Sequence, residues 1–231
     1  MSQRTVVITG ASRGIGRTLA QHYISQGWRV IATARDATTL SALNAANTFS
    51  LDATSEASIA ALAGQIGVEP VHLLINNAGI YVRGGLDELT QETLVQQFVT
   101  NSVGPLLVAK ALLPNLKLAA TSSSSPAVVA TVSSQMGSIG ANSSGGSYGY
   151  RASKSAVNSF SKTLALDLKK DNVSAIVMHP GYVITDMAPQ GHITTEQSVA
   201  GMSKVIQNAL ADRELALTGK FFNYSGEELP W

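Results

Sequence analysis

The stretch TVVITGASRGIG, residues 5–16, joins an apolar run to a glycine-rich loop. Residues 5–9 are β-branched without polar alternation, which predicts a strand buried on both faces. A helical pattern of apolar residues follows at positions 19, 20, 23 and 24. In a strand, glycine loop and helix of this kind, backbone N–H groups at the helix start face a bound pyrophosphate. The segment therefore predicts either a dinucleotide site or an ordinary turn, and the rest of the chain decides between them.

A regular alternation of strands and helices continues to the end of the chain. Strands are predicted at residues 29–33, 48–51, 71–75, 127–132, 173–178 and 220–223, and helices at residues 58–66, 89–101, 103–118, 150–168 and 199–210. Because βαβ crossovers are right-handed, this order gives an α/β fold, a Rossmann-type doubly wound parallel sheet flanked by helices on both faces. Neither an internal repeat nor a linker divides the chain, so a single domain, residues 1–231, is expected.

Three loops stand out by composition. Residues 121–125 are rich in serine, which is typical of a flexible surface connection. The Gly- and Ser-rich stretch 137–147 is longer than most βα connections, so we expect it to form a wall of the functional site. Residues 182–198 show little periodicity, so we expect a mobile cover over whatever the sheet binds.

Composition excludes several function classes. The net charge is +1, only 13% of the 231 residues are charged and no basic run occurs, which argues against a nucleic-acid surface. Cysteine is absent, so disulfides, thiolate metal sites and a cysteine nucleophile are excluded, and no metal site is expected. No apolar run is long enough to span a bilayer. The first strand follows directly on residues 1–4, which leaves no room for a signal peptide, and we expect a cytoplasmic protein.

The segment YRASK, residues 150–154, opens the longest predicted helix. Tyr150 and Lys154 are four residues apart and therefore share a helix face, together with apolar residues at 157, 164 and 168. A free phenol titrates near ~10, and a neighbouring ammonium group favours the phenolate. We therefore expect Lys154 to bring the pKa of Tyr150 toward neutrality and make it a general acid/base.

The end of the second strand indicates which dinucleotide is bound. Arg35 stands where a dinucleotide fold contacts the ribose, and Arg13 lies in the glycine loop. Two guanidinium groups suit a 2'-phosphate, whereas an acid would accept the hydroxyls of an NAD ribose. The pair therefore favours NADP(H), and it disfavours a methyltransferase, whose cofactor ribose is usually held by an acid. Two solvated surface arginines remain the alternative.

The combination of residues 9–16 and 76–79 with Ser134, Tyr150 and Lys154 resembles the short-chain dehydrogenase/reductase family over essentially the whole length. Residues 133–146 and the ending at 223–231 are similar to its C-factor-like and sniffer-type carbonyl reductases. The resemblance implies an enzyme that transfers a hydride between nicotinamide C4 and a carbonyl or alcohol substrate.

The resemblance also implies roles for single residues. Tyr150 matches the proton donor, Lys154 the residue that lowers its pKa and holds the nicotinamide ribose, Ser134 the group that polarises the carbonyl, and Asn101 the position that supports a water relay. The cofactor contacts that it implies are Gly10, Ser12, Arg13, Gly14, Ile15 and Gly16 in the glycine loop, Arg35, Asp52, Asn77, Ala78 and Gly79 on the adenosine side, and Tyr150, Lys154, Pro180, Gly181, Val183 and Thr185 around the nicotinamide. The spacing from Ser134 to Tyr150 is longer than the family's usual one, so Ser133 or Ser138 remains a possible substitute.

The sequence allows two alternatives each for the function and for the assembly of the chain. The main hypothesis is an NADP(H)-dependent carbonyl reductase or alcohol dehydrogenase; the alternative is a dinucleotide-binding sensor or signalling protein on the same fold. The helix at 150–168 also has a face of small, uncharged side chains, which favours a homodimer or homotetramer built on this helix and on residues 103–118. The alternative is that a loop of the same chain covers this face.

Overall fold

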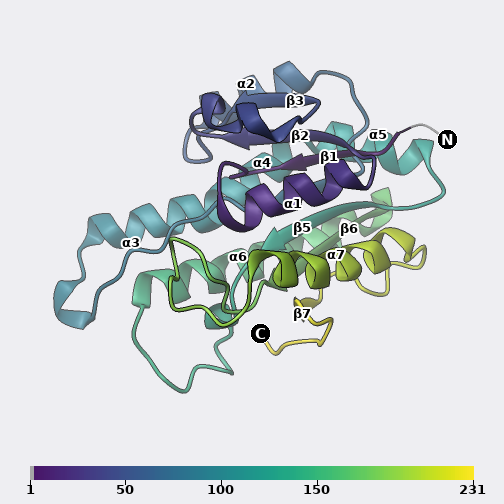
Figure 1. Ribbon diagram of the computed structural model, residues 1–231. Helices are drawn as coiled ribbons and strands as arrows, with labels where there is room; N and C mark the ends of the chain where they lie inside the picture. The colour runs from purple at the N-terminus through teal and green to yellow at the C-terminus, as the bar shows by residue number, and fades with distance from the viewer. Residues whose placement is uncertain (1–2) are drawn as a thin grey trace.

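A single parallel sheet forms the centre of the computed structural model, which describes residues 3–231 (Figure 1). Met1 and Ser2, which belong to the expected domain and to the segment ahead of the first strand, lie outside the described residues. The seven strands of the described chain run in the order β3-β2-β1-β4-β5-β6-β7. Their bounds are β1 Thr5–Ile8, β2 Arg29–Ala34, β3 Asn47–Ser50, β4 Leu73–Asn76, β5 Ala127–Val132, β6 Val173–His179 and β7 Phe221–Asn223. The predicted doubly wound α/β fold is confirmed.

Helices cover both faces of the sheet (Figure 1). The α-helices are α1 Gly14–Ser25, α2 Glu56–Ile66, α3 Gln91–Phe98, α4 Gly104–Ala111, α5 Leu113–Ser122, α6 Tyr148–Leu168 and α7 Thr195–Ala211. Short 3-10 segments occur at Ala37–Leu43, Leu86–Glu88, Gln135–Gly137 and Lys169–Asp171. Helices α1 and α7 pack on one face, and α2, α4, α5 and α6 on the other, while α3 packs on α6.

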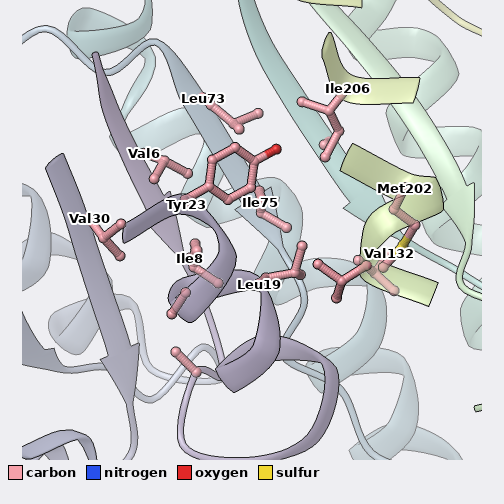
Figure 2. Close-up of a cluster of buried hydrophobic side chains, with 14 of the residues drawn as sticks. Val6, Ile8, Leu19, Tyr23, Val30, Leu73, Ile75, Val132, Met202 and Ile206 are labelled. Atoms are coloured by element: carbon pink, nitrogen blue, oxygen red, sulfur yellow. The ribbon is translucent and has the colours of Figure 1, made fainter. Parts of the chain in front are cut away.

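The alternation of side chains along the buried strands divides the core into two layers. Val6 and Ile8 of β1 point to the face of α1 and α7, whereas Val7 between them points to the opposite face. Figure 2 shows the first layer, where Tyr23 of α1 lies among strand residues and Ile206 of α7. Since each strand is covered on both faces, the apolar runs seen in the sequence are required along its whole length.

The two helices expected at 89–101 and 103–118 are divided differently in the structure. A π-helical segment, Val99–Val103, joins α3 to α4 without a break. The chain bends by 53° at Leu112 instead, where Pro114 enters the first turn of α5. Pro105 directly follows the π-helical segment, and the helix continues through it, whereas at Pro114 the missing N–H and the ring separate α4 from α5.

Other boundaries shift by a few residues. Helix α7 begins at Thr195, not at residue 199, because Thr194 and Gln197 form a capping box. The serine-rich segment expected as a loop belongs to α5 as far as Ser122, and α6 begins at Tyr148, two residues early. These differences change neither the order of the elements nor the sheet.

No single helix within residues 3–231 is long and apolar enough to cross a membrane. Residues 91–111 and α5 together are long and apolar enough for a membrane span by length and composition alone, but the two parts are bent by 53° at the break between them.

Candidate functional site

The polar residues singled out in the sequence gather where the strands end. Strands β1 and β4 are neighbours in the sheet, but the chain leaves them toward opposite edges, so a crevice opens beyond their carboxyl ends. The glycine loop follows β1, residues 77–79 follow β4, Ser134 follows β5 and Pro180 follows β6. The topology thus brings to one edge the residues that the sequence separates by more than a hundred positions.

The glycine loop has the backbone that a pyrophosphate requires. Gly10 and Gly14 have φ values of +68° and +51°, in the left-handed region that favours glycine. A Cβ on Gly16 would lie 2.1 Å from the carbonyl oxygen of Gly10. Helix α1 begins at Gly14, and no side chain within residues 3–231 caps its first turn. Its first N–H groups are therefore available to an anion, and the loop fits the phosphates of a dinucleotide.

Thr9 and Asn77 hold this loop in place. The Thr9 hydroxyl accepts the N–H groups of Asn77 and Ala78, each at 3.0 Å. The Asn77 amide donates to the carbonyl oxygens of Thr9 and Gly10 at 3.0 and 3.1 Å. A Cβ on Gly10 would lie 2.9 Å from the Cα of Ala78, so the two loops touch. The sequence reasoning missed this role of Thr9, although the residue belongs to the motif it used.

Two of the residues expected around the adenosine, Arg35 and Asp52, follow the ends of β2 and β3. Hydrogen bonds from Thr54 lower the pKa of Asp52, and the charge of exposed Arg35 lowers it further. The neighbouring Asp36 accepts the N–H and hydroxyl of Thr38, which ties its carboxylate to the next turn. Arg35 is thus the group of this edge whose chemistry fits a 2'-phosphate.

Arg13 is not simply a second free guanidinium beside Arg35. Its Nη1 lies 2.9 Å from Oδ2 of Asp186, in the loop after β6, and both side chains are about three-quarters exposed. Ser12 and Ile15, the other expected loop contacts, are half-buried, and Ile15 packs against the core. An exposed ion pair of this kind contributes little stability, so Arg13 can leave the Asp186 carboxylate for another anion such as a phosphate.

The loop after β6 forms the opposite wall of the crevice. Gly181 has a φ of +86°, and the Pro180 carbonyl oxygen accepts the Ser198 hydroxyl at 2.6 Å. Val183 is buried, and Thr185 lies within van der Waals reach of the glycine loop at Gly14. Backbone bonds between residues 182–185 and 188–193 fold the segment back on itself. The expected cover therefore has a defined course over the glycine loop.

Tyr150 and Lys154 point inward from the first turns of α6, as their spacing predicts. Lys154 is 4% exposed, and its Nζ donates to the carbonyl oxygen of Val132 at 2.9 Å. The same nitrogen lies 5.7 Å from the centre of the Tyr150 ring. A Cβ on Gly137 would approach the Lys154 carbonyl carbon to 2.7 Å, so this glycine lets the turn after β5 lie directly against α6.

The expected lowering of the Tyr150 pKa is not found in the protein environment. The pKa of Tyr150 is raised to about 12, chiefly by burial; Ser134 lowers it and nearby Tyr81 raises it, and the value is the net of these effects. Burial also lowers the pKa of Lys154 to about 8. The prediction was wrong because it considered the attraction between the two charges and neglected the desolvation of each.

Asn101 lies in the π-helical segment beside the lysine. Its side-chain amide bonds the N–H and the carbonyl oxygen of Ile80, at 2.8 and 2.9 Å, and donates to Ser153 Oγ at 3.0 Å. A Cβ on Gly79 would lie 3.1 Å from Asn101 Oδ1 and 3.7 Å from Lys154 Nζ. Gly79 therefore keeps space open beside the ammonium group and the Asn101 amide.

The structure separates the three candidate serines. Ser134 is close enough to Tyr150 to lower the pKa of the phenol, and its hydroxyl accepts the N–H of Met136 at 3.1 Å. Ser133 faces the other way and bonds Asn158 Oδ1 at 2.6 Å, while buried Ser138 accepts the N–H of Ala141. The geometry thus favours Ser134 as the partner of Tyr150 over the two substitutes.

Tyr81 is a site residue that the sequence reasoning missed. Its ring centre lies 4.9 Å from that of Tyr150, and its hydroxyl is 2.7 Å from Ser147 Oγ. No periodic pattern could have revealed it, because it follows the strand in an irregular segment. Nowhere in residues 3–231 do three His, Asp or Glu side chains gather closely enough to hold a metal ion.

Comparison with known proteins agrees with this geometry. The family model described as short chain dehydrogenase matches residues 4–197. C-signal of Myxococcus xanthus is 37% identical over 173 residues, which cover 74% of this chain and 99% of that protein. Two solved structures match over 100% of both chains: the NADPH-bound carbonyl reductase from chicken fatty liver (TM-score 0.89, 31% identity) and the carbonyl reductase Sniffer of D. melanogaster (TM-score 0.90, 30% identity).

The fold and the edge at which these side chains meet are those of a nicotinamide-dependent oxidoreductase. The chain belongs to the short-chain dehydrogenase family. The predicted resemblance to its C-factor-like and sniffer-type members is confirmed by the same matches.

Replacing Lys154 by methionine should stabilise the protein at neutral pH. Burial moves the pKa of Lys154 from 10.5 to about 8, and at about 1.4 kcal/mol per pKa unit this costs roughly 3 kcal/mol of folding free energy. The cost is present below pH 8 and is relieved as pH rises to 10.5, because the unfolded chain then holds the proton that the folded chain has lost. The variant also loses the hydrogen bond to Val132, so we expect Lys154→Met to raise the free energy of unfolding by about 1 to 2 kcal/mol at pH 7.

Urea unfolding at pH 7 and pH 10 measures this effect. The advantage of the variant should shrink at pH 10, where the wild-type chain is relieved of its buried charge. Lys204→Met, at an exposed position of α7, serves as the control and should show neither change. A variant less stable than the wild type at pH 7 would contradict the assignment of a destabilising buried ammonium.

Proposed function

We propose that the protein is an NADP(H)-dependent carbonyl reductase or alcohol dehydrogenase. The observation that carries the proposal is the cluster of Ser134, Tyr150 and Lys154, in which Ser134 follows β5 beside the tyrosine and the buried lysine has its Nζ 5.7 Å from the centre of the tyrosine ring. A phenol, a hydroxyl and an ammonium group at the ligand edge of a dinucleotide fold suit proton transfer to a carbonyl oxygen. The chemistry supplied by the bound cofactor is the exchange of a hydride at the nicotinamide.

The protein's own residues position the carbonyl group and move the proton. Ser134 donates a hydrogen bond to the carbonyl oxygen, and Tyr150 gives its proton to that oxygen as negative charge develops. Lys154 holds the nicotinamide ribose and stabilises the phenolate that remains. Gly79 and Asn101 border the space above Lys154, through which a proton can return from solvent. Placement of the reacting groups supplies much of the rate.

Similar proteins support the carbonyl substrate and the choice of cofactor. Two structures similar over their whole length are carbonyl reductases, and one of them holds NADPH. The second candidate is a dinucleotide-binding sensor or signalling protein, favoured by the similarity to C-signal. A sensor has no need of the Ser134, Tyr150 and Lys154 cluster, which therefore supports the enzyme. A panel of aldehydes, ketones and quinones with NADPH and NADH, followed at the absorbance of the reduced nicotinamide, tests the proposal.

Tyr150→Phe should abolish turnover and leave NADPH binding nearly intact. The phenylalanine keeps the packing of the ring against Tyr81 but has no proton to give. Loss of general acid catalysis lowers the rate by about two to four orders of magnitude. Steady-state kinetics and a fluorescence titration with NADPH measure the two quantities. Tyr148→Phe, on an exposed neighbour, is the control; a Tyr150→Phe enzyme with half the wild-type activity would refute the mechanism.

Arg35→Asp should erase or reverse a preference for NADPH over NADH. It replaces the cation proposed to bind the 2'-phosphate by a repelling carboxylate. Charge-assisted pairs of this kind contribute about 1.5 to 3 kcal/mol, roughly one to two orders of magnitude in affinity. Dissociation constants for both cofactors provide the measurement, with Arg213→Asp at the far end of the sheet as control. Equal constants for the two cofactors in the wild-type protein would exclude the assignment.

We also propose that the protein acts as a homodimer, or as a homotetramer containing that dimer. The proposed face lies on α6, where Ala152, Ser159, Thr163 and Leu166 are exposed. The other helix expected in the contact, residues 103–118, forms α4 and α5, of which α4 contacts α6. Helix α3 also packs on α6 and carries exposed Val95 and Phe98. Ser155 donates to the Gly137 carbonyl oxygen, so the chain covers one margin of the face and leaves the rest open. A cytoplasmic location remains a proposal from the sequence.

Ser159→Arg should split such an assembly into monomers. Ser159 is exposed in the single chain, so arginine leaves the fold intact while placing an unpaired charge at the centre of the contact. Light scattering behind a sizing column gives the mass, and Ala61→Arg on the exposed side of α2 is the control. A monomer mass for the wild-type protein at micromolar concentration would rule the dimer out.

A further inference from the structure

Arg151, the neighbour of Tyr150, makes four hydrogen bonds to the segment that precedes α6. Nε lies 3.2 and 3.1 Å from the carbonyl oxygens of Gly145 and Gly146. Nη2 donates to Ser144 Oγ at 2.8 Å, and Nη1 reaches the Met136 carbonyl oxygen at 3.4 Å. One side chain thereby joins the beginning and the end of the connection between Ser134 and Tyr150.

The end of this loop has a backbone that presents its carbonyl oxygens to the guanidinium. Gly145, Gly146 and Ser147 have φ values of +64°, +68° and +51°, three successive residues in the left-handed region. Such a conformation is unfavourable for serine and has to be held by its surroundings. Ser147 Oγ is held by the Tyr81 hydroxyl at 2.7 Å, and the ring of Tyr81 packs on Tyr150.

The beginning of the loop connects Arg151 with Ser134. The Ser134 hydroxyl accepts the N–H of Met136, and the Met136 carbonyl oxygen accepts a hydrogen bond from Nη1 of Arg151. Between these two ends, the Gly140 N–H donates to the Trp231 carbonyl oxygen at 3.2 Å. The segment itself is rich in Gly and Ser and carries Ile139, which is 79% exposed. Packing of its own side chains therefore does little to fix its course.

We propose that Arg151 is a positioning residue that holds residues 138–147 as one wall of the proposed substrate site, and that this wall limits the size of the carbonyl compounds that the site accepts. The inference rests on the proposed reductase function for its kinetic part. The loop begins and ends at the two residues that act on the carbonyl oxygen, so its course limits the space beside them. A planar guanidinium can bond several acceptors at once in fixed directions, which a lysine ammonium on a flexible stem cannot.

Arg151→Lys is the test, because it keeps the charge and loses the fork. Amide hydrogen exchange of peptides covering residues 137–149 should speed up roughly tenfold or more, since hydrogen bonds to a charged group are lost. The melting temperature and the NADPH dissociation constant should stay close to the wild-type values. Arg213→Lys, which alters an arginine bonded to Ser124 far from this edge, is the matched control.

Kinetics with two substrates of different size show whether Arg151 shapes the substrate site through residues 138–147 or only supports the fold in general. For a bulky bicyclic aromatic ketone, KM should rise about tenfold in Arg151→Lys, whereas a short aliphatic aldehyde, which does not reach the wall, should change less than about twofold. An equal loss for both substrates, or unchanged exchange in residues 137–149, would overturn the proposal. If the wild-type protein reduces no carbonyl compound, the proposed function fails, while the exchange experiment still decides whether Arg151 holds the loop.

Discussion

The burial of the Lys154 ammonium group is the constraint on which the arrangement of the site depends. An ammonium group away from water needs an acceptor, and the Val132 carbonyl oxygen provides it at the very end of β5. The bond ties the first turns of α6 to the strand that delivers Ser134. Two glycines make this possible from opposite sides: Gly137 allows the close approach to α6, and Gly79 leaves space above the charge. A side chain at either position would separate groups that the chemistry needs together.

The two halves of the crevice are built by different means. On the glycine-loop side, backbone groups and the Thr9 hydroxyl form a rigid cradle with few charges. Toward the adenosine end, the charged groups are exposed, and Arg13 and Arg35 can adjust to an anion. Backbone N–H groups fixed in the glycine loop can act only from set positions, whereas an exposed guanidinium can move toward an anion because the attraction between charges depends only weakly on direction.

Much of the fold could be predicted because its signals are local and repeated. Apolar runs specify buried strands such as β1 and β5, and glycines at a strand end specify the loop after β1. The helix break at Leu112 could not be placed, since Pro105 and Pro114 look alike until the register of the helix is known. For the site, the spacing of Tyr150 and Lys154 determined their common face. Contacts made across the fold, such as Tyr81 with Ser147, leave no periodic trace and had to be seen in the structure.

Burial also sets the protonation state of Tyr150, the proposed acid. A phenol whose pKa is raised to about 12 keeps its proton at neutral pH, which suits it to donate to a developing alkoxide. Oxidation of an alcohol needs the phenolate, and the protein environment alone disfavours that form. Lys154 offsets part of this cost. Its pKa is lowered to about 8, so the ammonium group is still charged at pH 7. Its Nζ lies 5.7 Å from the centre of the Tyr150 ring, where its charge stabilises a phenolate after the proton has left. Desolvation therefore favours proton donation, and the buried charge stabilises its product.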